Sequence, residues 1–139
     1  MKHILYITLI LILLCPKVRA QDKPLLIFFS FSMPESSINA LIDSAEKAGG
    51  VLVLRGLINN SFKDTIFTVK NLIKDKEVEI IIDPTLFRKY HVKTVPCFAV
   101  DRCLVCGNIT LKKAVSILSR CTDKAKPYRE KLEKTFYER

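Results

Sequence analysis

The stretch "VPCFAVDRCLVC", residues 95–106, contains two short apolar runs separated by two polar residues. The runs are Cys97–Val100 and Cys103–Cys106, and Asp101-Arg102 has the length of a tight hairpin connection, although it lacks the usual glycine. We therefore expect two antiparallel strands here, which fixes the last part of the sheet.

Three further apolar runs precede the hairpin and are expected to be strands. They are Leu25–Phe31, Val51–Leu54 and Glu79–Ile82. Helical patterns separate them, which favours parallel pairing, and the hairpin then adds an antiparallel edge. The order β-α-β-α-β-(short helix)-β-β-α predicts an α/β fold with a mixed sheet of about five strands.

Each long helical pattern carries apolar residues at helical spacing on one side. The first has Ile38, Leu41, Ile42 and Ala45 and ends at Gly49-Gly50, the second has Phe62, Ile66, Val69 and Ile73, and the last has Leu111, Ala114, Val115 and Leu118. We expect these sides to pack on the sheet. The charged segment 122–139 is expected to be a peripheral tail.

Two helix starts have recognisable caps. Ser32 and Glu35 fit a capping box with Pro34 in the first turn, and Asp83 before Pro84 fits a cap of the short helix. A binding role for Ser32 and Glu35 is the alternative to the cap.

Ser32, Met33, Pro34 and Arg55 follow the carboxyl ends of two predicted parallel strands, so they are expected on one rim of the sheet. We take these four residues as a candidate surface for a protein partner. Met33 either contacts a partner or fills a gap in the packing. Arg55 either binds a partner, forms an internal ion pair or ends its strand in solvent.

The first 20 residues have the pattern of a secretory signal peptide. Lys2 and His3 precede the apolar run Ile4–Leu14, and Val18-Arg19-Ala20 provides a cleavage site. We expect export and cleavage after Ala20, which leaves one domain over residues 21–121 and the tail. The alternatives are an uncleaved membrane anchor and, more weakly, a lipoprotein.

Charge and composition argue against nucleic acid and metal as ligands. Removing Lys2, Lys17 and Arg19 lowers the net charge from +9 to +6, and the remaining basic residues are scattered among acids. This pattern does not favour direct nucleic-acid binding. The spacing of Cys103 and Cys106 suits zinc, but a second such pair is missing, so we expect no metal site.

Four cysteines lie after Ala20, and an exported chain keeps disulfides. If Asp101-Arg102 is the turn, Cys97 lies opposite Cys106, and the last helix returns Cys121 to the level of Cys103. We therefore predict the bridges Cys97–Cys106 and Cys103–Cys121. The alternatives are four free thiols, or a Cys103–Cys106 linkage of the thioredoxin type.

The stretch "IIDPTLFRKYHVKTVPCFAV" and the hairpin after it resemble the thioredoxin-like superfamily. The resemblance implies a thioredoxin-like sandwich in which Pro96 is the cis-proline beside the strand-to-helix turn. In that superfamily the turn carries the redox cysteines, whereas here it reads Ser30-Phe31-Ser32-Met33-Pro34. A thiolate at the helix N-terminus is therefore missing, and we expect no catalytic residue there.

A narrower resemblance covers nearly the whole chain after Ala20. The blocks "IFFSFSMP", "VLVLRGL", "IDPTLFRKYHVKTVP" and "GNITLKKAV" are similar, in order and approximate spacing, to the F-type TrbC family of conjugative pilus assembly proteins. The resemblance implies a noncatalytic periplasmic component of an F-type type IV secretion system, without cofactor, whose partners are other assembly proteins such as a TraW-like protein. That family does not as a rule require Cys97, Cys103 or Cys106.

Two functions of different classes follow. The first is the noncatalytic assembly component, which contacts the membrane only through its signal segment. The second is an exported thiol-disulfide oxidoreductase that uses Cys103 and Cys106, although these residues lie on a hairpin strand without a helix dipole beneath them.

Overall fold

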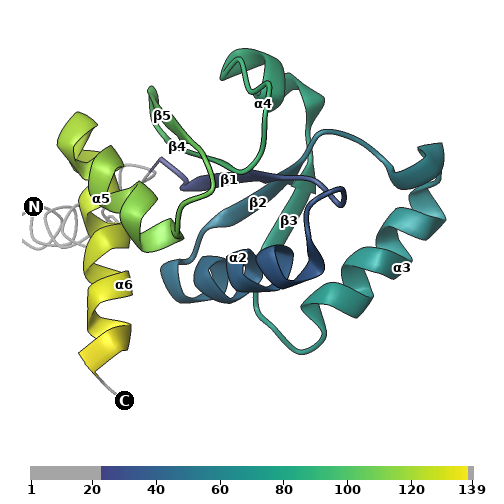
Figure 1. Cartoon of the computed structure of the whole chain (residues 1–139), viewed down its shortest axis with the longest axis horizontal. Helices are drawn as coiled ribbons and strands as arrows, with labels where there is room; N and C mark the ends of the chain where they lie inside the picture. The colour runs from purple at the N-terminus through teal and green to yellow at the C-terminus, as the bar shows by residue number, and fades with distance from the viewer. Residues whose placement is uncertain (1–22, 138–139) are drawn as a thin grey trace, which may run out of the picture.

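The computed structural model describes residues 23–137 (Figure 1). The expected signal segment, residues 1–20, lies outside the described residues, and so does its cleavage site. Within residues 23–137, no helix combines the length and the apolar character needed to cross a membrane.

A five-stranded sheet forms the centre of the fold. Its strands are β1 (Leu26–Phe29), β2 (Val51–Leu54), β3 (Glu79–Ile82), β4 (Cys97–Val100) and β5 (Cys103–Cys106). They lie in the order β3-β2-β1-β4-β5, with β1, β2 and β3 parallel and β4 antiparallel to both of its neighbours. The predicted α/β fold with a mixed five-stranded sheet is confirmed.

The β4–β5 hairpin has the register that the two-residue turn predicts. Val100 pairs with Cys103, and Cys97 pairs with Cys106. Asp101 takes the place of the missing glycine with φ of 55°, a left-handed conformation that aspartate tolerates better than most residues. The Tyr90 hydroxyl donates a 2.7 Å hydrogen bond to the Asp101 carbonyl and so holds the turn against the preceding helix.

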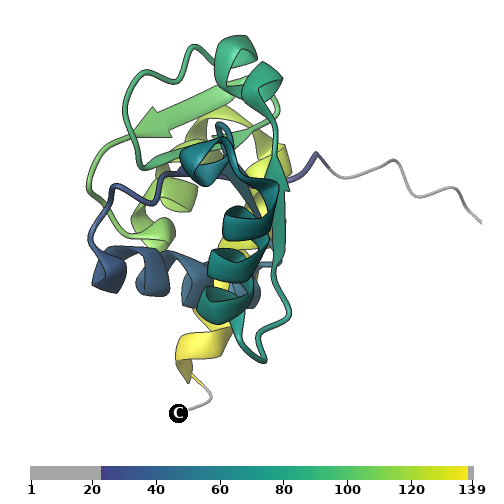
Figure 2. The ribbon, with the colours of Figure 1, turned by 90° about the vertical axis from the view of Figure 1, so that its right-hand side faces the viewer.

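The helices cover the two faces of the sheet unequally (Figures 1 and 2). They are α2 (Glu35–Ala48), α3 (Phe62–Ile73), α4 (Pro84–Lys89), α5 (Leu111–Cys121) and α6 (Lys126–Tyr137), with short 3₁₀ turns η1 (Ile58–Asn60) and η2 (Asp123–Ala125). The larger part of the core joins α2, α5 and α6 to one face, with α3 beside β3. The other face packs on α4 and the loop after it.

Local signals place α2, α4 and α5 as expected. The predicted apolar sides of α2 and α5 are buried, and α2 ends at Gly49 with φ of 70°. The Asp83 carboxylate caps α4 by accepting hydrogen bonds from the backbone N–H groups of Thr85 and Leu86. A further hydrogen bond from the Thr85 hydroxyl is the main cause that lowers the pKa of Asp83.

The prediction of which side of α3 faces the core is wrong for the first turns of the helix. Phe62 and Ile66 are exposed, whereas Thr65 is fully buried and Val69 packs on the core as expected. The Thr65 hydroxyl donates to the Ser61 carbonyl at 2.7 Å and accepts from the Ile58 N–H at 2.9 Å. These two bonds satisfy a buried polar group, so the helix turns Thr65 inward at the expense of larger apolar side chains.

Residues 126–137 differ from the expected peripheral tail. They form α6, and Ala125, Tyr128 and Leu132 are buried in the same core as α2 and α5. The Tyr128 hydroxyl donates a 3.0 Å hydrogen bond to the Lys23 carbonyl. Three buried side chains at helical spacing lie among the many charged residues of 122–137, which is why composition alone does not predict the helix.

Two disulfides join the hairpin to itself and to α5. Cys97 is bonded to Cys106 with a Cα–Cα distance of 4.0 Å, and Cys103 is bonded to Cys121 with a distance of 6.2 Å. The first pair was predicted from the hairpin register, and the second from the return of the last helix to the level of the turn. The second bridge fastens the end of α5 beside the hairpin turn.

We predict that the double substitution Cys103→Ser and Cys121→Ser lowers the free energy of unfolding by about 3 kcal/mol, because it frees a long loop in the unfolded chain. The substitution of Cys97 and Cys106 should cost roughly half a kilocalorie per mole less, since its loop is shorter. Urea unfolding of the oxidised proteins measures both. Peptide mapping of unreduced protein checks the pairing, and a Cys103–Cys106 linkage would contradict it.

A second prediction concerns Asp101, whose carboxylate accepts a 3.0 Å hydrogen bond from the Lys124 ammonium group. This bond lowers the pKa of Asp101 below its ordinary value of 3.8. Asp101→Asn retains tolerance of positive φ and removes only the charge, so it should slightly lower stability at pH 7. The difference from wild type should persist above pH 3.8 and vanish as the pH falls through the lowered pKa.

Thermal unfolding measured between pH 2 and pH 7 tests this expectation, with the exposed Asp75→Asn as control. A difference that is independent of pH would show that Asp101 acts through the turn backbone and not through its charge.

Candidate partner-binding site at the rim of the sheet

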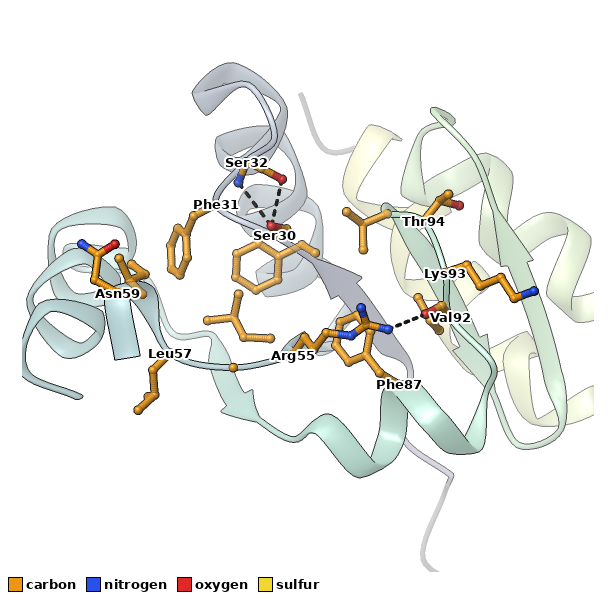
Figure 3. A pocket seen from close by; sticks show the side chains of 15 residues that line it. Ser30, Phe31, Ser32, Arg55, Leu57, Asn59, Phe87, Val92, Lys93 and Thr94 are labelled. Atoms are coloured by element: carbon orange, nitrogen blue, oxygen red, sulfur yellow. Dashed lines mark hydrogen bonds between the residues drawn. The ribbon is translucent and has the colours of Figure 1, made fainter. Parts of the chain in front are cut away.

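A pocket of about 630 Å³ lies at the carboxyl ends of β1 and β2 (Figure 3). It is bounded by the turn after β1, the loop after β2 and the segment 92–95 before β4. Its apolar walls are Phe29, Phe31, Leu54, Leu57, Ile58, Phe87, Val92 and Val95. Parallel strands that end together leave such a crevice between their loops, which is where open α/β sheets place binding sites.

The turn after β1 is held by its own serines. The Met33 N–H donates to the Ser30 carbonyl at 3.1 Å, and the Ser32 N–H donates to the Ser30 hydroxyl oxygen at 3.2 Å. The two hydroxyl oxygens are 3.0 Å apart. These bonds fix the turn and place Ser30 and Ser32 on the pocket wall (Figure 3).

The expected capping box at the start of α2 is wrong. The N-cap residue is Pro34, and no side chain caps this helix end. Ser32 stands two residues before the N-cap, and its hydroxyl lies against Ser30 instead of the helix. The Pro34 carbonyl still accepts hydrogen bonds from the N–H groups of Ser37 and Ile38, so the helix starts without a side-chain cap.

Arg55 links two walls of the pocket (Figure 3). Its Nη2 donates a 3.2 Å hydrogen bond to the Val92 carbonyl, and its guanidinium group lies 5.2 Å from the centre of the Phe87 ring. No ion pair involves Arg55 among the described residues. The cation therefore fastens the loop after α4 to the end of β2 while it remains exposed on the pocket surface.

The structure brings only part of the predicted surface together. Ser32 and Arg55 line the rim pocket. Met33 lines two smaller neighbouring hollows, one shared with Phe67 and one shared with Pro96. Pro34 lies at the start of α2 and is absent from the pocket lining.

Sequence reasoning missed the third wall of the pocket. Lys93, Thr94 and Val95 line it directly before Pro96, and the Val95–Pro96 peptide bond is cis. The sequence signal for this wall was Pro96. It directly precedes β4, which pairs with β1, so the residues before it reach the rim beside the turn after β1. Leu57 and Asn59 were also missed, because the loop after β2 carries no distinctive motif.

The pocket lining combines apolar walls with two basic side chains. Arg55 and Lys93 are its charged lining residues, so the pocket is apolar and basic. The lining holds two serine hydroxyls but no histidine or carboxylate that would activate either one. All four cysteines of the described chain are in disulfides away from the lining, and residues 23–137 contain no group of three potential metal ligands.

Comparison with known proteins adds a family and one curated relative. Residues 27–125 match the family described as "Type-F conjugative transfer system pilin assembly protein". The chain is also 40% identical over 76 residues to "Periplasmic protein TrbC" of Escherichia coli (strain K12). That alignment covers 54% of this chain and 36% of the relative, so the chain spans little more than a third of the relative's length. No solved structure matches the chain.

The family match extends from β1 through α5 to Ala125, and it therefore includes every residue of the sheet except Leu26 and every wall of the rim pocket. The four sequence blocks that resemble this family lie in the same region. The chain belongs to the F-type TrbC family of conjugative transfer pilin assembly proteins.

Proposed function

We propose that this chain is a noncatalytic periplasmic component of an F-type conjugation system, a type IV secretion system, and that it acts in pilus assembly. The observation that carries the proposal is the family match over residues 27–125. The relative's description as periplasmic supports the location. Export through residues 1–20 with cleavage after Ala20 is part of the proposal.

The proposal includes a thioredoxin-like fold that binds without redox chemistry. In support of this fold, β1 lies at the centre of the sheet and Pro96 directly precedes β4. The turn after β1 begins a helix, as a thioredoxin-like active site would, but it contains serines and a methionine instead of cysteines. The domain would span residues 21–121, with α6 packed against it.

The rim pocket is the proposed contact with other proteins of the machine, such as a TraW-like protein. Its apolar walls favour an inserted apolar side chain, while Arg55 and Lys93 favour a nearby carboxylate of the partner. Met33 and Pro34 extend this surface toward α2. A partner segment that carries both an apolar and an acidic residue fits this combination.

The oxidoreductase alternative finds less support in the arrangement of the cysteines. Cys103 and Cys106 belong to two different disulfides, with Cys121 and Cys97 as their partners. Both lie on strand β5, so neither is at the N-terminus of a helix, where a thiolate would be stabilised. A redox cycle between Cys103 and Cys106 would require both bridges to open first.

We predict that Arg55→Glu and Lys93→Glu each reduce pilus number in a donor strain deleted for this gene by about tenfold relative to wild-type complementation, because each reverses a charge on the pocket. Arg55→Glu also loses its bond to Val92 and its contact with Phe87, so it should lower stability by about 1–2 kcal/mol. Lys93→Glu should change stability by less than about 0.5 kcal/mol. Pilus counts and thermal unfolding of the purified proteins measure the two effects.

The control is Lys113→Glu, an exposed charge reversal on α5 that should assemble pili normally. Normal pili with both rim variants would contradict a binding role for the pocket. Loss of pili with Arg55→Glu alone, accompanied by unfolding, would make Arg55 a structural residue.

We also predict that the purified exported chain does not accelerate reduction of a disulfide substrate by dithiothreitol. The physical reason is the absence of a thiolate at the turn after β1. Substrate turnover is measured with and without protein. Acceleration that disappears in Cys103→Ser or Cys106→Ser would overturn the noncatalytic proposal.

A further inference from the structure

The most exposed large apolar side chains of residues 23–135 gather in one short segment. Leu57 is 39% exposed, Phe62 66%, Ile66 47% and Phe67 67%. Three of them project from α3, which lies at the surface of the molecule with no other described element over its outer side (Figure 2). We call Phe62, Ile66 and Phe67, together with the neighbouring Lys63 and Lys70, the α3 ridge.

The ridge is not an unfinished part of the core. The inner side of α3 is already occupied by Thr65, whose hydroxyl makes two hydrogen bonds, and by Val69 and Leu72, which pack on the core. Rotating the helix to bury Phe62 and Ile66 would break both hydrogen bonds of Thr65. Exposed aromatic side chains gathered on one helix are costly in water and mark an interaction surface.

The charges on the ridge are basic and unpaired. Lys63 and Lys70 are exposed, and their spacing of seven residues puts them on one side of the helix, about 10 Å apart along its axis. Neither forms an ion pair with a described residue. The single carboxylate of α3 is Asp64, in the first turn of the helix.

A hollow of about 370 Å³ lies beside the ridge, between α3 and the start of α2. Phe67 and Leu72 form its α3 wall, and Phe31 and Met33 form part of the opposite wall. Its one charged lining residue is Glu35, which belongs to α2 and not to the ridge. The hollow has room for a single large apolar side chain from a partner.

We propose that the α3 ridge docks an acidic amphipathic helix of another protein. The apolar stripe of that helix covers Phe62 and Ile66 and places one side chain in the hollow beside Phe67. Carboxylates along the same helix lie opposite Lys63 and Lys70, where a helix with acids seven residues apart matches both cations. This proposal stands on the ridge alone and does not depend on the function of the rim pocket.

Charge argues against two other occupants. A second copy related by a two-fold axis would place the same basic ridge on both sides of the contact, so Lys63 and Lys70 would face cations. The second is the segment 1–22, which lies outside the described residues. It carries Lys2, Lys17 and Arg19 and a single acid, Asp22, so its charge is also basic and does not complement Lys63 and Lys70. A membrane surface would satisfy the lysines but would leave the hollow beside Phe67 without a matching side chain.

The test uses the chain purified from the periplasm and two synthetic helical peptides with the same leucine stripe. One peptide carries glutamates beside the stripe and the other carries lysines at the same positions. Fluorescence anisotropy should detect binding of the glutamate peptide only. The variant Lys63→Glu/Lys70→Glu should weaken that binding by about tenfold and gain affinity for the lysine peptide.

The matched control is Lys113→Glu/Arg120→Glu, which reverses two exposed charges seven residues apart on α5. It changes the net charge by the same amount and places the charges at similar positions in the helix. Binding of the glutamate peptide should stay within about twofold of wild type. An equal loss in the control would show that net charge acts alone and would overturn the proposal.

Three further results would also overturn it. The first is the absence of binding to the glutamate peptide, or equal binding of both peptides. The second is binding to phosphatidylethanolamine–phosphatidylglycerol vesicles that Lys63→Glu/Lys70→Glu abolishes, which would identify a membrane surface. The third is a dimer in sedimentation that Phe62→Ser/Phe67→Ser dissociates. Because none of these measurements counts pili, their failure is separate from failure of the proposed function.

Discussion

The burial of β1 is the constraint on which the rest of the structure depends. Its side chains are almost completely removed from water, and it is paired with β2 on one side and with β4 on the other. A strand in this position needs helices over one face and a cover over the other, which α2 and α4 provide. Its carboxyl end necessarily opens at the rim, so the same constraint that builds the core also locates the pocket beside Ser30 and Ser32.

The parts of the fold that follow from the sequence are those in which one local signal acts without competition. The Asp101-Arg102 turn sets the hairpin register, and the apolar periodicity of α2 and α5 sets their buried sides. In α3 two signals compete. Hydrophobicity favours a helix orientation that buries Phe62, whereas the hydrogen bonds of Thr65 favour an orientation that buries Thr65. In the rim pocket, Ser32 and Arg55 could be predicted because they follow the ends of strands. Lys93 could not, because it lies on a loop whose position depends on tertiary packing.

The two candidate surfaces are neighbours and share a wall. Phe31 lines both the rim pocket and the hollow beside α3, and its ring packs against Phe29 at the end of β1 with 5.7 Å between the centroids. A ligand that moves the Phe31 ring in one hollow therefore changes the shape of the other. The arrangement gives a physical basis for energetic coupling between two partners that bind at the same end of the sheet.

The hydrogen bond from Tyr128 to the Lys23 carbonyl has a consequence for the order in which the domain is completed. Lys23 precedes the central strand, whereas Tyr128 and Leu132 belong to the last helix and are buried in the same core cluster as Leu25 and Ile27. A chain that emerges from its amino end presents the central strand first and α6 last. Until α6 forms, the sides of α2 and α5 on which it packs remain open to water and the Lys23 carbonyl lacks this hydrogen bond, so the carboxyl-terminal helix completes the core last.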